Sequence, residues 1–187
     1  LSAPPPSDAL IRAARWVMRH ENPRVMNQMA ASATALRLAG EILEDDGLLQ
    51  AARRRIARLL EGQHPQGYFV EYGGYDIGYQ TITLSCLAKY YWHTRDTAVS
   101  AAARAGFRFL DGLIRENGTY DYQATSRKTQ YFYPFGFRVM EEWELLNRHR
   151  TGLRKNEVVT PAWLDDRYCL PLAIDYLHTA VHDAGVF

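Results

Sequence analysis

Tyrosine is unevenly distributed along this chain. Of its 12 tyrosines, eight fall within residues 63–79 and 117–133, two segments that also carry carboxylate, amide and hydroxyl groups. Such a mixture suits sugars, because their C–H faces stack on aromatic rings while their hydroxyls hydrogen-bond to planar polar groups. The two segments therefore indicate a carbohydrate-binding surface. The alternative is that these tyrosines pack one segment against the other and leave only their hydroxyls in water.

Carboxylates in the same segments allow a second chemistry. A glycoside hydrolase requires one carboxylic acid with a raised pKa and a second carboxylate that acts as base or nucleophile. Glu71, Asp76 and Asp121 are available for these roles. Asp76 also stands directly before an apolar helical pattern, where it would cap a helix. The sequence leaves the catalytic and the capping roles open.

The histidines and cysteines indicate little further chemistry. His64 lies in the first Tyr-rich segment and is the one histidine that we consider a candidate binding group. His178 and His182 have the i, i+4 spacing of zinc ligands, but no glutamate stands between them in the HExxH order. Cys86 and Cys169 lack metal-ligand spacing and are expected to be free thiols. We expect no metal site and no cofactor.

The overall composition argues against several classes of partner. The 22 Lys and Arg residues balance 21 Asp and Glu residues, and this net charge of +1 argues against nucleic acid and against an anionic membrane. No stretch approaches the roughly 20 apolar residues that cross a bilayer. We expect one domain over residues 8–187, preceded by a linker or processed end at 1–7. The arginines of residues 53–58 are expected on a solvated outer face.

The spacing of apolar residues is helical almost everywhere, and no segment alternates as a strand, so the sequence predicts an all-α fold. Ser7, Asp45 and Asp96 are expected N-caps, and Gly40 and Asn117-Gly118 mark expected helix ends. The predicted helices span residues 8–20, 26–40, 47–62, 78–93, 96–116, 134–149 and 162–183.

An internal repeat organises these helices. Gly67-Tyr68 follows the third predicted helix, and Gly118-Thr119-Tyr120 follows the fifth, 51 residues later (118 minus 67). A period near 50 with two helices per unit predicts an array of α/α hairpins, either open or closed into a toroid. Because alternate connections then lie on one side, both Tyr-rich loops and the Asn22-Pro23-Arg24 turn should share one face. Long loops of this kind usually carry function.

The order of these motifs resembles a known family. A helix that opens with Asn27-Gln28-Met29-Ala30-Ala31 is followed, after an outer helix, by Gly67-Tyr68-Phe69-Val70-Glu71-Tyr72 and then by Asp76-Ile77-Gly78-Tyr79. Residues 22–140 are in this respect similar to (α/α)-toroid polysaccharide lyases of the heparinase and alginate-lyase type. A closed toroid needs more than the roughly three and a half hairpins predicted here, so the resemblance implies a missing domain or self-association.

The resemblance also implies a reaction, the β-elimination of an acidic, uronate-containing polysaccharide or oligosaccharide. Asn27, with Arg127 as a second candidate, would contact the sugar carboxylate, and Tyr79 or Tyr75 would act as base and acid. A tyrosine is a poor base at neutral pH unless a cation lowers its pKa, and Arg127 and Arg24 are the cations on the predicted face. The expected substrate-binding residues are Arg24, His64, Tyr68, Tyr72, Gln80, Tyr120, Tyr122, Tyr131 and Tyr133.

Three alternatives use the same face. A glycoside hydrolase of the same architecture would release saturated fragments, and a uronosyl epimerase would leave the sugars saturated. A lyase, in contrast, leaves an unsaturated end. A non-catalytic helical-repeat module would bind glycans or proteins without turnover.

Overall fold

The computed structural model describes residues 8–164 and 168–185 and shows an all-α protein, as predicted. The predicted linker at 1–7, with its expected cap Ser7, lies outside the described residues. The α-helices are α1 (Asp8–Arg19), α2 (Met26–Leu43), α3 (Asp46–Glu61), α4 (Ile77–Thr94), α5 (Thr97–Asp111), α6 (Phe135–Val139), α7 (Trp143–Lys155) and α8 (Cys169–Asp183). Two short 3-10 helices, η1 (Tyr122–Ala124) and η2 (Pro161–Trp163), lie in the connections.

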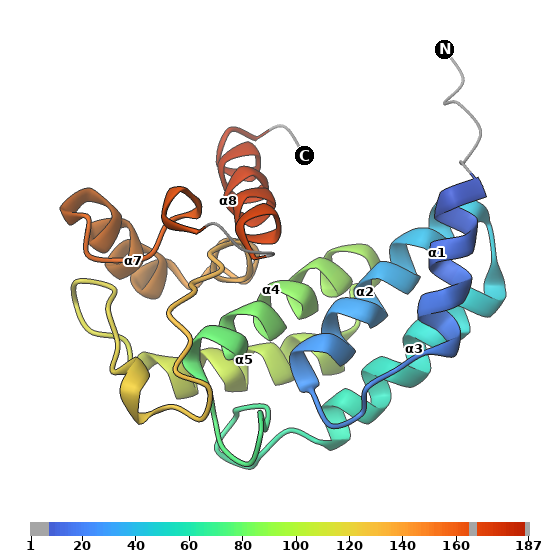
Figure 1. Cartoon of the computed structure of the whole chain (residues 1–187), viewed down its shortest axis with the longest axis horizontal. Helices are drawn as coiled ribbons and strands as arrows, with labels where there is room; N and C mark the ends of the chain where they lie inside the picture. Colours follow the sequence, from blue (N-terminus) through green and yellow to red (C-terminus); the bar gives the residue numbers. More distant parts are fainter. Residues whose placement is uncertain (1–7, 165–167, 186–187) are drawn as a thin grey trace.

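The helices form an array of hairpins (Figure 1). The hairpins α2–α3, α4–α5 and α6–α7 follow one another, and their first helices pack in the order α2, α4, α6. At one end α1 packs on α2 and α3, and at the other end α8 packs on α6. The core between these layers is apolar and includes Leu36, Leu59, Leu84, Phe107, Leu110 and Phe137. The predicted α/α-hairpin array is thereby confirmed.

The same turn closes the connections that follow α3 and α5. In the first, the backbone N–H of Gly67 donates to the His64 carbonyl at 2.7 Å, and the N–H of His64 donates to the Tyr68 carbonyl at 2.8 Å. Both bonds recur in the second connection, 51 positions later in the sequence. There the N–H of Gly118 donates to the Arg115 carbonyl, and the N–H of Arg115 donates to the Thr119 carbonyl, each at 2.8 Å.

The glycine of each turn presses on the outer helix of the next hairpin. Gly67 has φ +101° and Gly118 has φ +77°, a region that side chains disfavour. A Cβ atom on Gly67 would lie 2.2 Å from the carbonyl oxygen of Ala105 in α5, and one on Gly118 would lie 2.6 Å from that of Arg148 in α7. Each turn therefore requires glycine both for its backbone conformation and for its contact.

Side-chain caps begin α3 and α5, the outer helices of the first two hairpins, as predicted. Asp45 accepts hydrogen bonds from two backbone amides at the start of α3, and Asp96 does the same for α5. Gly40, which we expected to end α2, lies inside that helix, so this prediction was wrong. A Cβ atom there would lie 2.6 Å from Cδ2 of Leu49, and the glycine instead lets α2 and α3 pack closely.

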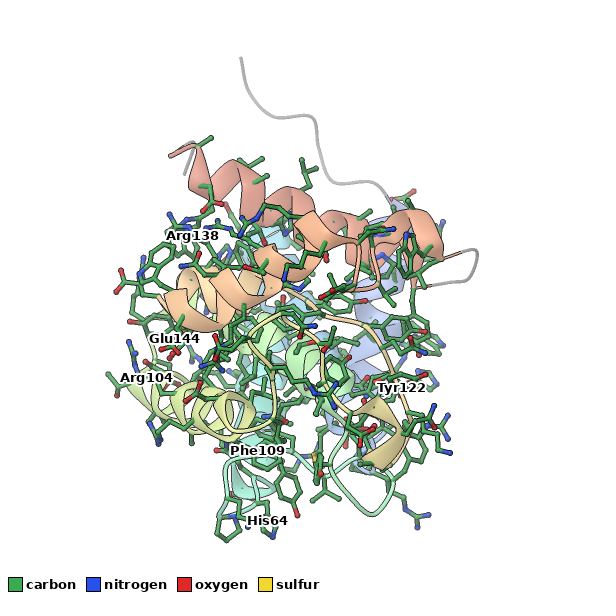
Figure 2. The ribbon with its side chains drawn as sticks, turned by 90° about the vertical axis from the view of Figure 1, so that its left-hand side faces the viewer. His64, Arg104, Phe109, Tyr122, Arg138 and Glu144 are labelled. Atoms are coloured by element: carbon green, nitrogen blue, oxygen red, sulfur yellow. The ribbon has the colours of Figure 1, made fainter. Side chains whose placement is uncertain are left out.

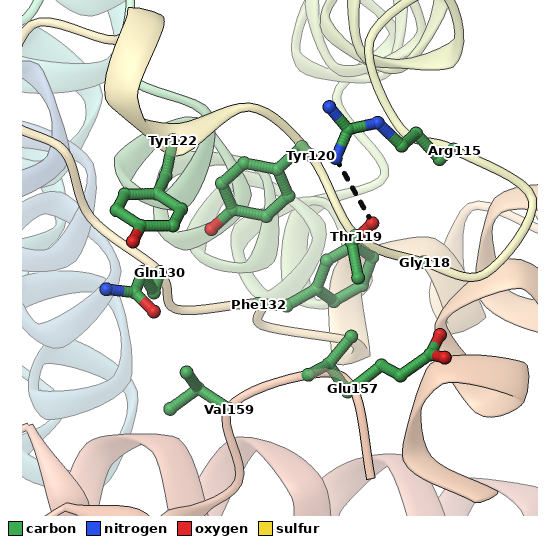
Figure 3. A pocket seen from close by; sticks show the side chains of 10 residues that line it. Arg115, Gly118, Thr119, Tyr120, Tyr122, Gln130, Phe132, Glu157 and Val159 are labelled. Carbon is green, nitrogen blue, oxygen red and sulfur yellow. Dashed lines mark hydrogen bonds between the residues drawn. The ribbon is translucent and has the colours of Figure 1, made fainter. Parts of the chain in front are cut away.

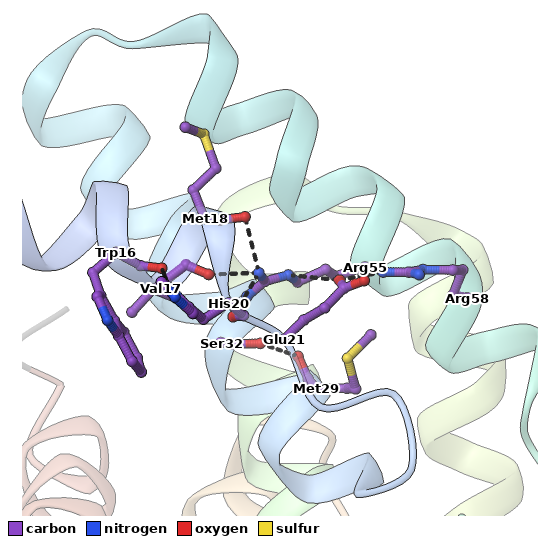
Figure 4. Close-up of polar contacts among 9 residues, drawn as sticks. All are labelled: Trp16, Val17, Met18, His20, Glu21, Met29, Ser32, Arg55 and Arg58. Atoms are coloured by element: carbon purple, nitrogen blue, oxygen red, sulfur yellow. Dashed lines mark hydrogen bonds and ion pairs between the residues drawn. The ribbon is translucent and has the colours of Figure 1, made fainter.

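Arg55 is buried, contrary to the prediction, whereas the other arginines of residues 53–58 are exposed. Its side chain points at the end of α1, where Nη2 donates to the carbonyls of Val17, Met18 and His20 at 2.5, 3.2 and 3.0 Å (Figure 4). Glu21 lies 3.4 Å from its Nε. The last carbonyls of a helix lack partners and carry partial negative charge, so this cation docks α1 onto α3.

The predicted helix at 134–149 is two helices. The chain leaves α6 at Met140, and Glu141 adopts φ +62° before α7 begins at Trp143. The backbone N–H of Glu142 then donates to the Phe137 carbonyl at 2.9 Å, which closes a tight turn. Nothing in the local residue types signals this break.

The fifth and seventh predicted helices have wrong boundaries. The fifth ends at Asp111, before the expected stop at Asn117-Gly118, because the amides of Leu113 and Ile114 both return to the Leu110 carbonyl. The seventh, predicted over 162–183, begins at Cys169, and η2 occupies residues 161–163.

Candidate functional site

The two Tyr-rich loops lie against each other on one face, as predicted. Ser126 joins them twice, because its N–H donates to the Tyr75 carbonyl at 3.0 Å and its hydroxyl donates to the Glu71 carbonyl at 2.6 Å. The first loop also pairs with the turn before α2, where Val25 and Glu71 form an antiparallel bridge. Both loops and this turn lie along the lower side of Figure 1.

Asp76 holds the second loop in place. Its side chain is 1% exposed and caps α4 by accepting a hydrogen bond from the Tyr79 amide at 2.9 Å. The same carboxylate accepts bonds from the Thr125 hydroxyl at 3.0 Å, the Arg127 amide at 3.1 Å and both the amide and hydroxyl of Thr129. The capping role is therefore observed. The catalytic role of Asp76 stays a prediction, and both of its carboxylate oxygens already accept hydrogen bonds from the protein.

Glu71 and Asn27 bind each other. One carboxylate oxygen of Glu71 accepts bonds from the backbone and side-chain amides of Asn27, at 2.6 and 2.9 Å. The carboxylate thereby caps α2, whose N-cap residue Val25 makes no side-chain bond. Burial raises the pKa of Glu71 above its usual value, against an opposing effect of the bonds from Asn27. Both predicted catalytic residues thus contribute to the attachment of the first loop.

Half-buried aromatic side chains of the first loop form a cluster on Phe109 of α5. His64 stacks on Tyr68 with ring centroids 4.2 Å apart, and the rings of Tyr68 and Tyr75 lie 5.0 and 5.2 Å from that of Phe109. Figure 2 shows His64 at the lower edge of the molecule, with Phe109 above it. Three predicted site residues thus lie together here, namely His64, Tyr68 and Tyr75. None of them lines the pockets described next.

Three predicted binding residues are buried and hold the loops from inside. The amide oxygen of Gln80 accepts a bond from the Phe69 N–H at 2.9 Å, and the Tyr120 hydroxyl donates to the Tyr131 carbonyl at 2.8 Å. Tyr133 is buried as well, and burial raises the pKa of both phenols. Tyr120 thus braces its own loop from inside, with its hydroxyl bonded to a carbonyl and not left in water.

An open pocket lies where the second loop meets α4 and the start of α8. Its volume is about 520 Å³. We call it the Arg127 pocket, and its described lining is Tyr79, Arg127, Lys128, Thr129, Gln130, Tyr131, Val159, Trp163, Leu164 and Tyr168. The lining thus combines two cations with four aromatic side chains and, among the described residues, includes no carboxylate. Trp163 is 52% exposed, so its ring is free to take a flat ligand.

Tyr79 is the central phenol of this pocket. Its hydroxyl lies 3.2 Å from that of Tyr168, and the rings of Tyr168 and Tyr131 stack at 4.8 Å. Burial raises the pKa of Tyr79 strongly, the hydrogen bond and charge of Tyr168 raise it further, and Arg127 lowers it by less. Tyr79 is therefore a neutral phenol at physiological pH, which suits a proton donor better than a base. Arg127 also lies over the Tyr72 ring, 4.3 Å from its centroid.

A second pocket of about 250 Å³ adjoins the first (Figure 3). The two pockets share Gln130 and Val159 and therefore lie side by side along the second loop, and we refer to the two together as the groove. We call the second one the Tyr122 pocket. Its other lining residues are Arg115, Gly118, Thr119, Tyr120, Tyr122, Phe132, Glu157 and Val158.

The structure therefore gathers only part of the predicted site. Tyr79, Arg127, Tyr131, Tyr120 and Tyr122 line the groove, and Tyr72 borders it through Arg127. Arg24 is exposed in the turn before α2, and the remaining predicted residues lie in the first loop, in its contact with Asn27 or in the interior. Lys128, Trp163 and Tyr168 also line the Arg127 pocket and were not among the predicted residues. Lys128 follows Arg127 directly and could have been included, whereas the last two lie outside the repeat and carry no signal.

No protein family, curated protein or solved structure matches this chain. In the part of the chain that the structure describes, no helix is both long and apolar enough to cross a membrane. The same residues contain no cluster of three or more His, Cys, Asp or Glu side chains that could hold a metal ion, and both cysteines are free thiols.

Proposed function

We propose that the protein binds an acidic, uronate-containing polysaccharide in the groove of the Arg127 and Tyr122 pockets and cleaves it by β-elimination. The observation that carries this proposal is the lining of the Arg127 pocket. Two cations and four aromatic side chains meet there without an opposing carboxylate among the described residues. Cations attract uronate groups, and exposed rings such as that of Trp163 stack on sugar faces.

The reaction would divide between Arg127 and the two phenols. In a β-elimination the C5 proton passes to a base, the C4–O bond breaks to leave a C4=C5 double bond, and the departing oxygen takes a proton. Arg127 would neutralise the C5 carboxylate, and Tyr79, as a neutral phenol, would donate the proton to the departing oxygen. Tyr168 is the second hydroxyl beside Tyr79, at 3.2 Å, and would have to be ionised to remove the C5 proton.

A second candidate function is binding without turnover. The raised pKa of Tyr79 favours it, because this tyrosine cannot serve as a base at neutral pH, and no carboxylate or histidine lines the Arg127 pocket within the described residues. A glycoside hydrolase has less support, since the carboxylates of Glu71 and Asp76 are both 1% exposed and engaged in helix caps. An epimerase would need the same base as a lyase.

Incubation with alginate, pectate, hyaluronan and heparan sulfate separates these functions. Unsaturated ends, detected by ultraviolet absorbance, identify a lyase, and saturated fragments identify a hydrolase. Binding without fragments, measured by affinity electrophoresis, identifies a binding module. Arg127→Ala should weaken binding at least about tenfold, whereas Arg12→Ala, which removes an exposed arginine of α1, should not. If none of the four polymers binds, the proposal is wrong.

A further inference from the structure

A separate pocket lies between the far part of α4 and α8. It is lined by Leu38 of α2, Lys89, Trp92 and His93 of α4, Phe135 of α6, and His178 and His182 of α8, and its volume is about 310 Å³. Lys89 and Trp92 follow Tyr79 by roughly three turns of α4, which separates this pocket from the Arg127 pocket by about 15–20 Å along the helix. The two pockets share no lining residue.

Apolar and aromatic side chains form the walls of this pocket. The ring of His182 meets the edge of Trp92 with centroids 4.9 Å apart, and it lies 6.1 Å from the ring of Phe135. His178 contacts Phe135 as well, at 5.6 Å. A volume near 300 Å³ is at the small end of the range for ligand pockets. Its occupant would therefore be a small molecule with a flat or branched apolar body.

The polar side chains that line this pocket can donate hydrogen bonds to a ligand. Lys89 donates one hydrogen bond to Asp175 at 2.8 Å, which leaves two of its three ammonium hydrogens for another acceptor. His93 pairs with Glu41 at 2.8 Å through Nδ1. No described lining residue is a carboxylate.

The clearest indication of a ligand comes from His182. Both of its ring nitrogens are buried, and neither has a hydrogen-bond partner among the described residues. A buried polar atom without a partner costs about 1–3 kcal/mol. An acceptor placed between His182 and Lys89 would satisfy one imidazole N–H and the ammonium group together.

We propose that this pocket, which we call the His182 pocket, binds a small organic carboxylate carried on an aromatic or branched apolar body. The apolar part would lie against Trp92 and Phe135, and the carboxylate would accept hydrogen bonds from His182 and Lys89. This site is separate from the polysaccharide groove, because it uses other residues and another part of α4.

Phenylacetate is a suitable probe, followed by NMR of the histidine and tryptophan side chains of the whole protein. The resonances of His178, His182 and Trp92 should shift and saturate together, while those of His20 on α1 stay constant. Phenylacetamide, which has the same ring but no charge, and acetate, which has no ring, should each bind at least about tenfold more weakly. Equal binding of the acid and its amide would overturn the proposal, as would the absence of a saturable shift at His182.

Variants locate the ligand. His182→Phe keeps a ring and removes both nitrogens, so it should weaken phenylacetate binding at least about tenfold, and the matched change His20→Phe should have no effect. Arg127→Ala should leave binding unchanged, and a loss there would place the ligand in the other pocket and refute the assignment. Should His182→Phe fail to fold, intermolecular NOEs between phenylacetate and Trp92 in the unaltered chain decide, and their absence would refute the site.

Discussion

The pH dependence of stability should be governed in large part by His149. This residue of α7 is 1% exposed, its ring stacks on Phe132 with centroids 3.9 Å apart, and Nε2 lies 2.8 Å from the Tyr176 hydroxyl. Burial lowers its pKa from 6.5 to about 3, and the charge of Arg150 contributes to this decrease. As the pH falls, this histidine therefore takes up a proton at a higher pH in the unfolded chain than in the folded chain.

The sign and size of the effect follow from these two pKa values. Stability is full above the unfolded pKa of 6.5 and is lost as the pH falls from there toward about 3. At about 1.4 kcal/mol per pH unit, the loss is on the order of 2 kcal/mol at pH 5 and reaches about 5 kcal/mol when both states are protonated. Glu71 has the opposite effect, since its raised pKa favours the folded state at low pH. Glu71 is present in wild type and in any His149 variant, so its contribution cancels when the two are compared.

Urea unfolding followed by far-ultraviolet circular dichroism at pH 7.5 and pH 5 tests this reasoning. Wild type should lose about 2 kcal/mol more than His149→Phe between these two pH values. That variant keeps the ring stack on Phe132 and removes the titrating group, so its loss of the bond to Tyr176 is a constant offset. His20→Phe, at an exposed position, should follow wild type. Parallel pH profiles for wild type and His149→Phe would show that the buried imidazole does not control acid stability.

Three further predictions concern stability. Gly67→Ala should lower the free energy of unfolding by at least about 3 kcal/mol, because its Cβ would collide with the backbone of α5, whereas Gly73→Ala, which meets no atom within 4 Å, should lose only about 1 kcal/mol in chemical denaturation. Arg55→Ala should lose about 2–4 kcal/mol and expose the end of α1 to proteolysis, while Arg53→Ala should change stability by less than about 0.5 kcal/mol. In Asp76→Ala the amides of residues 125–129 should exchange hydrogen faster than those of α3, and unchanged protection there would contradict its anchoring role.

The sequence predicted the elements that carry local signals. Asp45 and Asp96 mark helix starts through their own side-chain bonds, and the glycines at 67 and 118 mark a turn that recurs at a fixed spacing. Local signals of this kind are readable because the partners lie within a few positions along the chain. The hairpin array and the common face of the loops followed from them.

The composition of the groove could not be predicted in the same way. Tyr72 and Tyr120 occur in similar loops, yet Tyr72 is exposed and Tyr120 is buried with its hydroxyl bonded to the Thr129 and Tyr131 carbonyls, contacts that the residue types alone do not signal. Tyr168 reaches Tyr79 across 89 positions of sequence, from a segment with no repeat signal. Arg55 likewise looks like its exposed neighbours, and only the approach of α1 distinguishes it.

The glycine turns also determine how order spreads through the molecule. Each turn rests on the outer helix of the following hairpin, so the first Tyr-rich loop is completed by α5 and the second by α7. A substitution that loosens α7 would therefore disturb the loop bearing Arg127 without touching a single residue of the groove. The coupling is mutual, because a loop that rests on the following hairpin also stabilises that hairpin, and it makes the stability of α7 part of the stability of the binding surface.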